Sequence, residues 1–123
     1  MTNEKMTALY CRSAHTNDDA IAMQEATLRN FASDNGYSNI SVYKDNGENG
    51  INFNRPALSI LEAEIDAGRI GMVIVHNISR IGRDIFKMQD WIVNLRRKGV
   101  SFISVTDGLN DSHFEDLLQR VSG

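Results

Sequence analysis

Apolar positions in this chain alternate between short continuous runs and longer stretches with helical spacing. The continuous runs predict four strands, at Thr7–Cys11, Ile40–Lys44, Met72–Val75 and Ser101–Val105. Between them, apolar residues recur at intervals of three, four and seven, which predicts helices at Asp18–Asn35, Pro56–Gly68 and Asp84–Lys98. Alternating strands and helices are typical of a parallel sheet covered on both faces. We therefore expect a three-layer α/β domain with a central, mostly parallel sheet of four or five strands.

Turn and capping residues mark the ends of these elements. Thr16 and Asp19 resemble a capping box before the first helix, and Gly99 is expected to end the third long helix. His113–Val121 is expected to form a short final helix. With 123 residues and no internal repeat or linker, the chain is expected to be one domain over residues 1–123.

The charge of the chain is distributed unevenly. The net charge is −3 and the pI about 5.5, unlike the basic balance of a typical nucleic-acid-binding domain. Residues 80–98, however, contain six basic and two acidic side chains, a net charge of +4. Any contact with nucleic acid is therefore expected to use this local patch, with bulk affinity supplied by another domain.

Several classes of protein do not fit this sequence. The polar N-terminus has no apolar core for a signal peptide, and no apolar run approaches the roughly 20 residues of a membrane span. Cys11 is the only cysteine, so a reducing, cytoplasmic location is expected. The three histidines are scattered, which argues against a zinc site.

The segment from Ser79 to Asp84 is the most informative part of the sequence. It follows an apolar strand and precedes the most strongly amphipathic helix, and it contains Arg80 and Arg83. Guanidinium groups present several donors in a rigid fork, and the N–H groups at the start of a helix point the same way. The segment therefore predicts a receptor for a phosphate group.

Other polar side chains follow the other predicted strands. Ligands of open α/β sheets collect beyond the carboxyl ends of the strands. The residues expected at this edge are Arg12 and Ser13 after the first strand, Asp45 and then Arg55 after the second, Ser79, Arg80 and Arg83 after the third, and Gln24 from the first helix. Four arginines, a hydroxyl and a carboxylate, with no set of metal ligands, suit phosphoryl transfer to a side-chain nucleophile.

These residues give the chain a resemblance to the catalytic domain of the serine recombinases, which include resolvases, invertases, integrases and transposases. The resemblance covers about residues 7 to 110, and its strings are weak singly but specific in their order. They are Tyr10-Cys11-Arg12 before Ser13, Gln24 with Leu28, Tyr43-Lys44-Asp45 with Gly50, Arg55-Pro56-Ala57-Leu58, Ser79-Arg80-Ile81-Gly82-Arg83-Asp84, and Leu95-Arg96-Arg97-Lys98-Gly99-Val100 with Phe102-Ile103-Ser104-Val105. A serine before the arginine pair, as at Ser79, resembles the large serine recombinase branch.

The resemblance implies site-specific cutting and rejoining of DNA through a covalent phosphoserine, without a metal or a small-molecule cofactor. By motif position, Arg12, Arg80 and Arg83 would bind the scissile phosphate as catalytic residues. The catalytic nucleophile would be Ser13, one place before the family's serine position. The residues that complete or orient the site would be Gln24, Asp45 and Arg55. The implied partners are DNA and further copies of the chain, as a dimer that pairs into a tetramer.

Two departures from the family pattern leave alternatives open. The family has its nucleophile two residues after the first arginine, where this chain has Ala14, and Ser13 stands one place early. Either Ser13 is the nucleophile, brought into place by a bulge, or the domain is a degenerate relative that binds or regulates without cutting. The family also continues into a long helix and a DNA-binding region after this domain, which are not in this sequence. A flavodoxin-like small-molecule binder is disfavoured because no glycine-rich loop follows the first strand.

Overall fold

The structure of the protein is a computed structural model that describes residues 5–47, 55–82 and 84–110. Arg83 and the helix expected at His113–Val121 lie outside these residues. The strands are β1 (Met6–Ser13), β2 (Ile40–Asn46), β3 (Ile70–Val75), β4 (Ser101–Ser104) and β5 (Leu109–Asn110). The helices are α1 (Asp18–Asp34), α2 (Pro56–Asp66) and α3 (Ile85–Arg97), with a single 3₁₀ turn, η1 (Ile78–Arg80), between β3 and α3.

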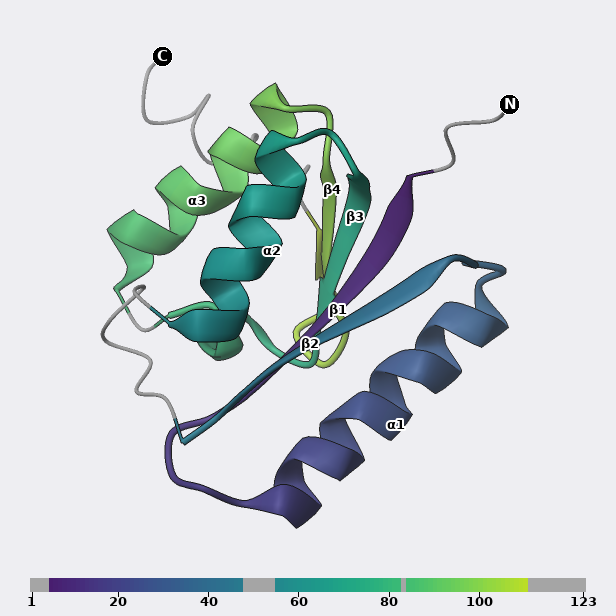
Figure 1. Ribbon diagram of the computed structural model, residues 1–123, viewed down its shortest axis with the longest axis vertical. Helices are drawn as coiled ribbons and strands as arrows, with labels where there is room; N and C mark the ends of the chain where they lie inside the picture. Colours follow the sequence, from purple (N-terminus) through teal and green to yellow (C-terminus); the bar gives the residue numbers. More distant parts are fainter. Residues whose placement is uncertain (1–4, 48–54, 83, 111–123) are drawn as a thin grey trace.

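The strands form one sheet in the order β2-β1-β3-β4-β5. The first four are parallel, and β5 pairs antiparallel with β4. In Figure 1, α1 covers one face of this sheet, while α2 and α3 lie together on the other. The predicted three-layer α/β architecture with a mostly parallel sheet is confirmed.

Alternating side chains of β1 supply the core on both faces of the sheet. Ala8 and Tyr10 pack among apolar residues of α2 and α3, whereas Leu9 and Cys11 pack against α1. All four side chains are fully buried. Because β1 has a strand on each side and helices on both faces, the backbone at its carboxyl end is held rigidly.

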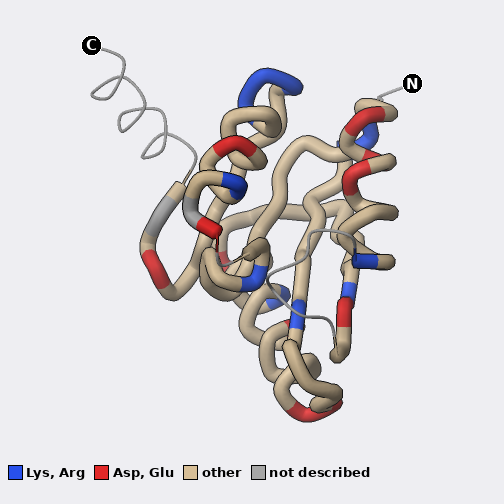
Figure 2. The backbone as a smooth tube through the Cα atoms, turned by 90° about the vertical axis from the view of Figure 1, so that its left-hand side faces the viewer, with Lys and Arg blue, Asp and Glu red and all other residues tan. Residues whose placement is uncertain are grey.

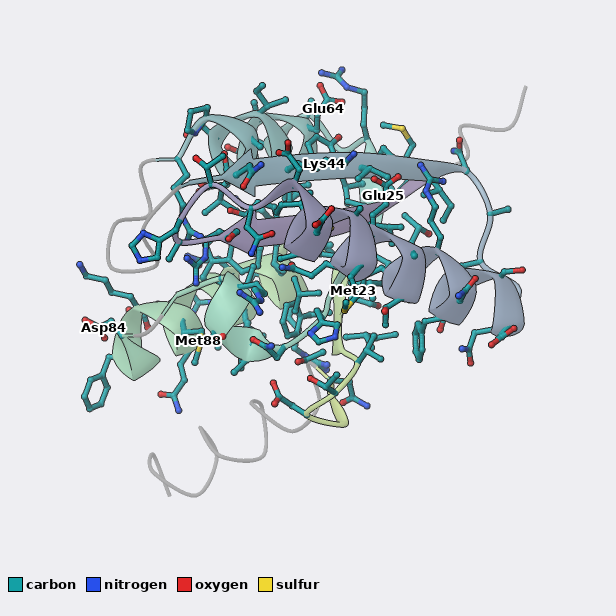
Figure 3. All side chains as sticks on the ribbon, turned by 90° about the horizontal axis from the view of Figure 1, so that it is seen from below. Met23, Glu25, Lys44, Glu64, Asp84 and Met88 are labelled. Carbon is teal, nitrogen blue, oxygen red and sulfur yellow. The ribbon has the colours of Figure 1, made fainter. Side chains whose placement is uncertain are left out.

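The start of α1 differs from the expected capping box. Asn17, not Thr16, is the N-cap, and its Oδ1 accepts a hydrogen bond from the N–H of Ala20 at 3.0 Å. An asparagine directly before the helix reaches the free N–H groups that a serine or threonine would otherwise bind. Farther along α1, Glu25 points toward Lys44 of β2 (Figure 3), and their charged atoms are 2.6 Å apart.

Cys11 is expected to be unreactive while the domain is folded. Burial raises the pKa of its thiol to about 11, and only the thiolate attacks disulfide reagents. We expect an aromatic disulfide reagent at pH 8 to label Cys11 at least about 100-fold more slowly in the folded domain than in urea. Equal labelling rates in the two states would contradict the burial of this side chain.

Candidate functional site

Most of the residues expected in the site meet at the carboxyl edge of the sheet. Arg12 comes from the end of β1, Asp45 from the end of β2 and Arg80 from η1 after β3. Arg55 directly precedes α2, and Gln24 lies on α1. Figure 2 shows basic positions of separate segments close together near the middle of the view, in agreement with the hydrogen bonds described below.

Two of the arginines bind the backbone of η1. The Nε of Arg12 donates to the carbonyl oxygen of Arg80 at 3.0 Å, and its Nη2 donates to that of Ser79 at 2.8 Å. Arg55 donates to the carbonyl of Arg80 at 2.8 Å and to the carbonyl of Ile81. Arg12 and Arg55 are 2% and 1% exposed. Their guanidinium groups therefore fix the segment that carries Arg80.

Asp45 links three elements beneath this segment. Its carboxylate accepts hydrogen bonds from the N–H groups of Ala57 and Leu58, at 2.8 and 3.0 Å, and so caps the start of α2. It also accepts one from the hydroxyl of Tyr10 at 2.7 Å, and that hydroxyl in turn accepts one from Arg55 at 3.1 Å. Burial, together with the hydrogen bond to Asp45, raises the pKa of Tyr10 well above its ordinary value. Tyr10 thus stays a neutral donor.

Gln24 takes the place of a neighbouring strand. The pairing of β1 with β3 ends at Tyr10 and Val75, so the backbone of Arg12 extends beyond this ladder. The Oε1 of Gln24 accepts from the Arg12 N–H at 3.2 Å, and its Nε2 donates to the Arg12 carbonyl at 3.0 Å. One amide side chain therefore satisfies both backbone groups of Arg12, as a strand would.

Replacing Gln24 by alanine should therefore loosen the end of β1. It leaves the N–H and carbonyl of Arg12 with fewer partners in a buried place, which costs about 1–3 kcal/mol of folding free energy. Urea unfolding of Gln24→Ala against Gln89→Ala, a half-buried glutamine on α3, measures the difference. If the two variants lose the same stability, the side chain of Gln24 does not have this role.

Arg80 differs from the two buried arginines. Its side chain is only partly buried; its Nη1 donates to the carbonyl of Arg12 at 3.1 Å, and its buried Nε has no hydrogen-bond partner among the described residues. The described part of this cluster holds three guanidinium groups (Arg12, Arg55, Arg80) and one carboxylate, that of Asp45, which is linked to Arg55 through the Tyr10 hydroxyl. Such an excess of positive charge at a half-buried site favours an anion.

Ser13 lies beside this cluster, and its hydroxyl is engaged elsewhere. Its side chain is 9% exposed, and its Oγ donates to the carbonyl of His15 at 2.5 Å. Ser13 is still part of β1, where successive side chains point to opposite faces of the sheet. Ala14 follows the strand, and His15 and Thr16 are exposed. The Ser13 hydroxyl is therefore bonded within its own loop, and the alternation of β1 directs it away from the side of the sheet that Arg12 faces.

Three residues of the site region were not identified from the sequence. In the sequence, Tyr10 appears only within the string Tyr10-Cys11-Arg12, and nothing in the pattern shows that its hydroxyl reaches Asp45. The sequence pattern assigns no role to Asn46 or Asp107. Asp107 accepts hydrogen bonds from the N–H of Ile78 and the hydroxyl of Ser104, both at 2.7 Å, and so holds the start of η1. Only the register of the sheet reveals these contacts.

The described residues contain no group of three or more His, Cys, Asp or Glu side chains that could hold a metal ion. Among the helices of the described part, none is long and apolar enough to cross a membrane.

Comparisons with known proteins agree with this architecture. The family described as "Resolvase, N terminal domain" matches residues 7–121. Among solved structures, the N-terminal catalytic domain of TP901-1 integrase has a TM-score of 0.86 at 24% identity, covering 96% of this chain and 94% of that chain. A resolvase family site-specific recombinase from Streptococcus pneumoniae has a TM-score of 0.75 at 20% identity, covering 97% and 89%.

A third similar structure is the C-terminal catalytic domain of ISC1926 TnpA, an IS607-like serine recombinase. Its TM-score is 0.73 at 24% identity, with 81% of this chain and 67% of that chain covered. A search of curated proteins found no match. The match to the family extends over nearly the whole chain and spans the described sheet, except Met6 of β1, and the residues of the site described above. The chain belongs to the resolvase N-terminal domain family and has the fold of the serine recombinase catalytic domains.

Proposed function

We propose that this domain cuts and rejoins DNA strands as the catalytic domain of a site-specific recombinase. The observation that carries the proposal is the gathering of Arg12, Arg55 and Arg80 at the carboxyl edge of the sheet, with one carboxylate near them among the described residues. Arg12 and Arg55 both donate to the carbonyl of Arg80, and Arg80 donates to the carbonyl of Arg12. A phosphodiester carries one negative charge and gains more on its equatorial oxygens as a nucleophile attacks. The half-buried guanidinium of Arg80, next to the buried ones of Arg12 and Arg55, suits that change.

In the proposed reaction, the Oγ of Ser13 attacks the scissile phosphorus. A Ser13 Oγ–P bond forms, the P–O3′ bond breaks, the serine proton is lost, and the 3′ oxygen leaves with a proton as a hydroxyl group. The 5′ end stays on the protein as a phosphoserine. This bond keeps the energy of the diester, so attack by a new 3′ hydroxyl rejoins the strands without a nucleotide or metal cofactor.

The side chains are assigned different roles in this reaction. Arg80, partly exposed and with an unpaired Nε among the described residues, is the proposed ligand of the phosphate, with Arg83 beside it by motif position. Arg12 and Arg55 hold the backbone of η1, while Gln24 and Asp45 hold the ends of β1 and α2. Before attack, the Ser13 hydroxyl exchanges its bond to the His15 carbonyl for the phosphate.

The setting of the reaction follows from the same proposal. Residues 1–123 act as a single catalytic domain on DNA in the cytoplasm, and a DNA-binding region outside this sequence supplies most of the affinity. Two recombining sites require two pairs of cut strands, so the active assembly is a dimer that pairs into a tetramer. The acidic net charge of −3 is consistent with a domain that touches DNA only locally.

A second candidate function is that of a recombinase-like domain that associates with DNA or with an active recombinase but does not cut. Two observations favour it: Ala14 stands where the family has its serine, and the Ser13 hydroxyl is bonded within its own loop. The receptor residues would then bind a phosphate without an attacking group.

Trapping the covalent intermediate separates the two functions. The protein, in its full-length context, is incubated with a nicked suicide duplex that contains its crossover site, beside a related active recombinase on its own site. We expect a protein–DNA adduct that resists detergent, is absent in Ser13→Ala and persists in Thr16→Ala. The lack of an adduct while the related enzyme forms one would leave only the non-cutting function.

A further inference from the structure

The loop that carries Ser13 is held at both of its ends by the end of β2. Ser13 and Asn46 are paired in the parallel ladder between β1 and β2. At the first end of the loop, the carbonyl of Ser13 accepts a hydrogen bond from the N–H of Gly47 at 2.8 Å. At the second end, the N–H of Asn17 donates to the Oδ1 of Asn46, also at 2.8 Å. The five residues 13–17 therefore form a bridge with both ends attached to residues 46 and 47.

The side chain of Asn46 uses both halves of its amide in this arrangement. While Oδ1 accepts from Asn17, Nδ2 donates to the Oδ1 of Asp18 at 2.7 Å. Asn17 is the N-cap of α1 and Asp18 its first residue. The amide of Asn46 thus fixes where α1 begins relative to β2. Because the loop from Ser13 leads into α1, this contact also limits the positions that the loop can adopt.

Gly47 shows independently that the loop lies tightly against β2. Its φ of +94° is a conformation that residues with side chains rarely adopt. A Cβ at this position would lie 2.8 Å from the Oγ1 of Thr16, closer than two such atoms approach. The loop therefore passes directly over residue 47, where the backbone N and Cα of Thr16 would lie 3.6 and 3.8 Å from such a Cβ.

We propose that Asn46 is a positioning residue for the nucleophile. Its amide fixes the position of the Ser13 loop relative to the end of β2. Asp45, the preceding residue of β2, points to the other face and holds α2 and Tyr10. Asn46 thus positions the Ser13 loop on one side of the sheet, while Asp45 supports the arginine cluster on the other side. The effect of Asn46 on catalysis rests on the proposed function of Ser13 as the nucleophile.

The positioning role predicts a change in amide exchange that does not depend on DNA cutting. In Asn46→Ala we expect the Asn17 amide to exchange with deuterium about 3- to 10-fold faster, because its acceptor is gone. The Phe86 amide, which Asp84 caps at the start of α3, should be unchanged. Asn94→Ala, an exposed asparagine on α3, serves as the matched control variant.

Swapping the residue types at positions 46 and 18 tests the contact between Asn46 and Asp18. Asn46→Asp keeps an acceptor for the Asn17 amide but places two carboxylates at hydrogen-bond distance, so we expect exchange in the loop to rise above the wild-type rate. Asp18→Asn alone should behave like wild type. The double variant N46D/D18N restores one donor and one acceptor, and exchange in the loop should return to the wild-type rate.

The same variants are then compared for adduct formation on the suicide duplex. Asn46→Ala should form the adduct about 10- to 100-fold more slowly, as expected for a displaced nucleophile, and N46D/D18N should recover. Unchanged Asn17 exchange in Asn46→Ala, or a double variant no better than Asn46→Asp, would overturn the positioning role. If wild type forms no adduct, the function of Ser13 fails, whereas the exchange rates still decide whether Asn46 holds the loop.

Discussion

Replacing Asp45 by alanine is expected to destabilise the domain by about 3–5 kcal/mol, the largest loss of stability expected here for a single substitution. The carboxylate caps α2 through two backbone N–H groups and accepts the hydroxyl of Tyr10. It is also the one carboxylate of the described arginine cluster and is 3% exposed. Its removal leaves the two N–H groups of α2 and the Tyr10 hydroxyl buried without their acceptor, beside uncompensated positive charge. A water molecule in the place of the carboxylate makes up only part of this loss.

Equilibrium unfolding in urea measures this loss. Asp90→Ala, an exposed carboxylate on α3, is the control and should change stability by less than about 0.5 kcal/mol. Asp45→Asn should lie between the two, because its amide oxygen still accepts from α2 while the charge that faces Arg55 is lost. A loss below about 1 kcal/mol for Asp45→Ala would mean that the carboxylate does not organise the site.

Replacing Arg80 by alanine should have the opposite profile, with a large loss of activity and a small loss of stability. Its guanidinium is the one proposed to meet the phosphate, and removing one such donor from a site of charge development costs about 10²- to 10³-fold in rate. The rate of adduct formation on the suicide duplex is the measurement. Unfolding in urea should shift by no more than about 1 kcal/mol, because only part of the side chain is buried.

The matched control for Arg80 is Arg29 on the outer face of α1. Arg29→Ala removes a guanidinium that is more exposed to solvent than that of Arg80 and that pairs with Glu25 of the same helix. It should keep the wild-type rate of adduct formation. Equal losses in Arg80→Ala and Arg29→Ala would show that the charge of the domain as a whole, and not this receptor, supports the reaction.

The fold follows largely from the apolar pattern of the sequence. The continuous apolar runs at β1 and β3 and the helical spacing of α1, α2 and α3 predict the alternation of elements that the structure shows. The rule that parallel strands bring their carboxyl ends to one edge was sufficient to bring Arg12, Asp45 and Arg80 together. β5 was missed because its two residues have neither the length nor the alternation of a recognisable strand.

The roles of the individual side chains could not be predicted in the same way. Arg12 and Arg55 were expected on or near a phosphate, and the structure places their donors on backbone carbonyls. Gln24 pairs with the backbone of β1, a contact that depends on where β3 ends. These contacts depend on the register of the strands and on the side-chain rotamers. Neither can be predicted from residue types and their spacing. The same is true of the Ser13 hydroxyl, whose direction depends on the loop that follows.

We propose that the strand ends form one phosphate receptor centred on Arg80. Titration of the ¹⁵N-labelled domain with a dinucleotide that contains a single phosphodiester tests it most directly. The claim predicts that the amides of Arg12 and of Arg80 to Gly82 shift together, that salt weakens the effect, and that Arg80→Met abolishes it. Equal shifts in Arg80→Met, or shifts confined to the basic end of α3 at Arg96 to Lys98, would contradict it.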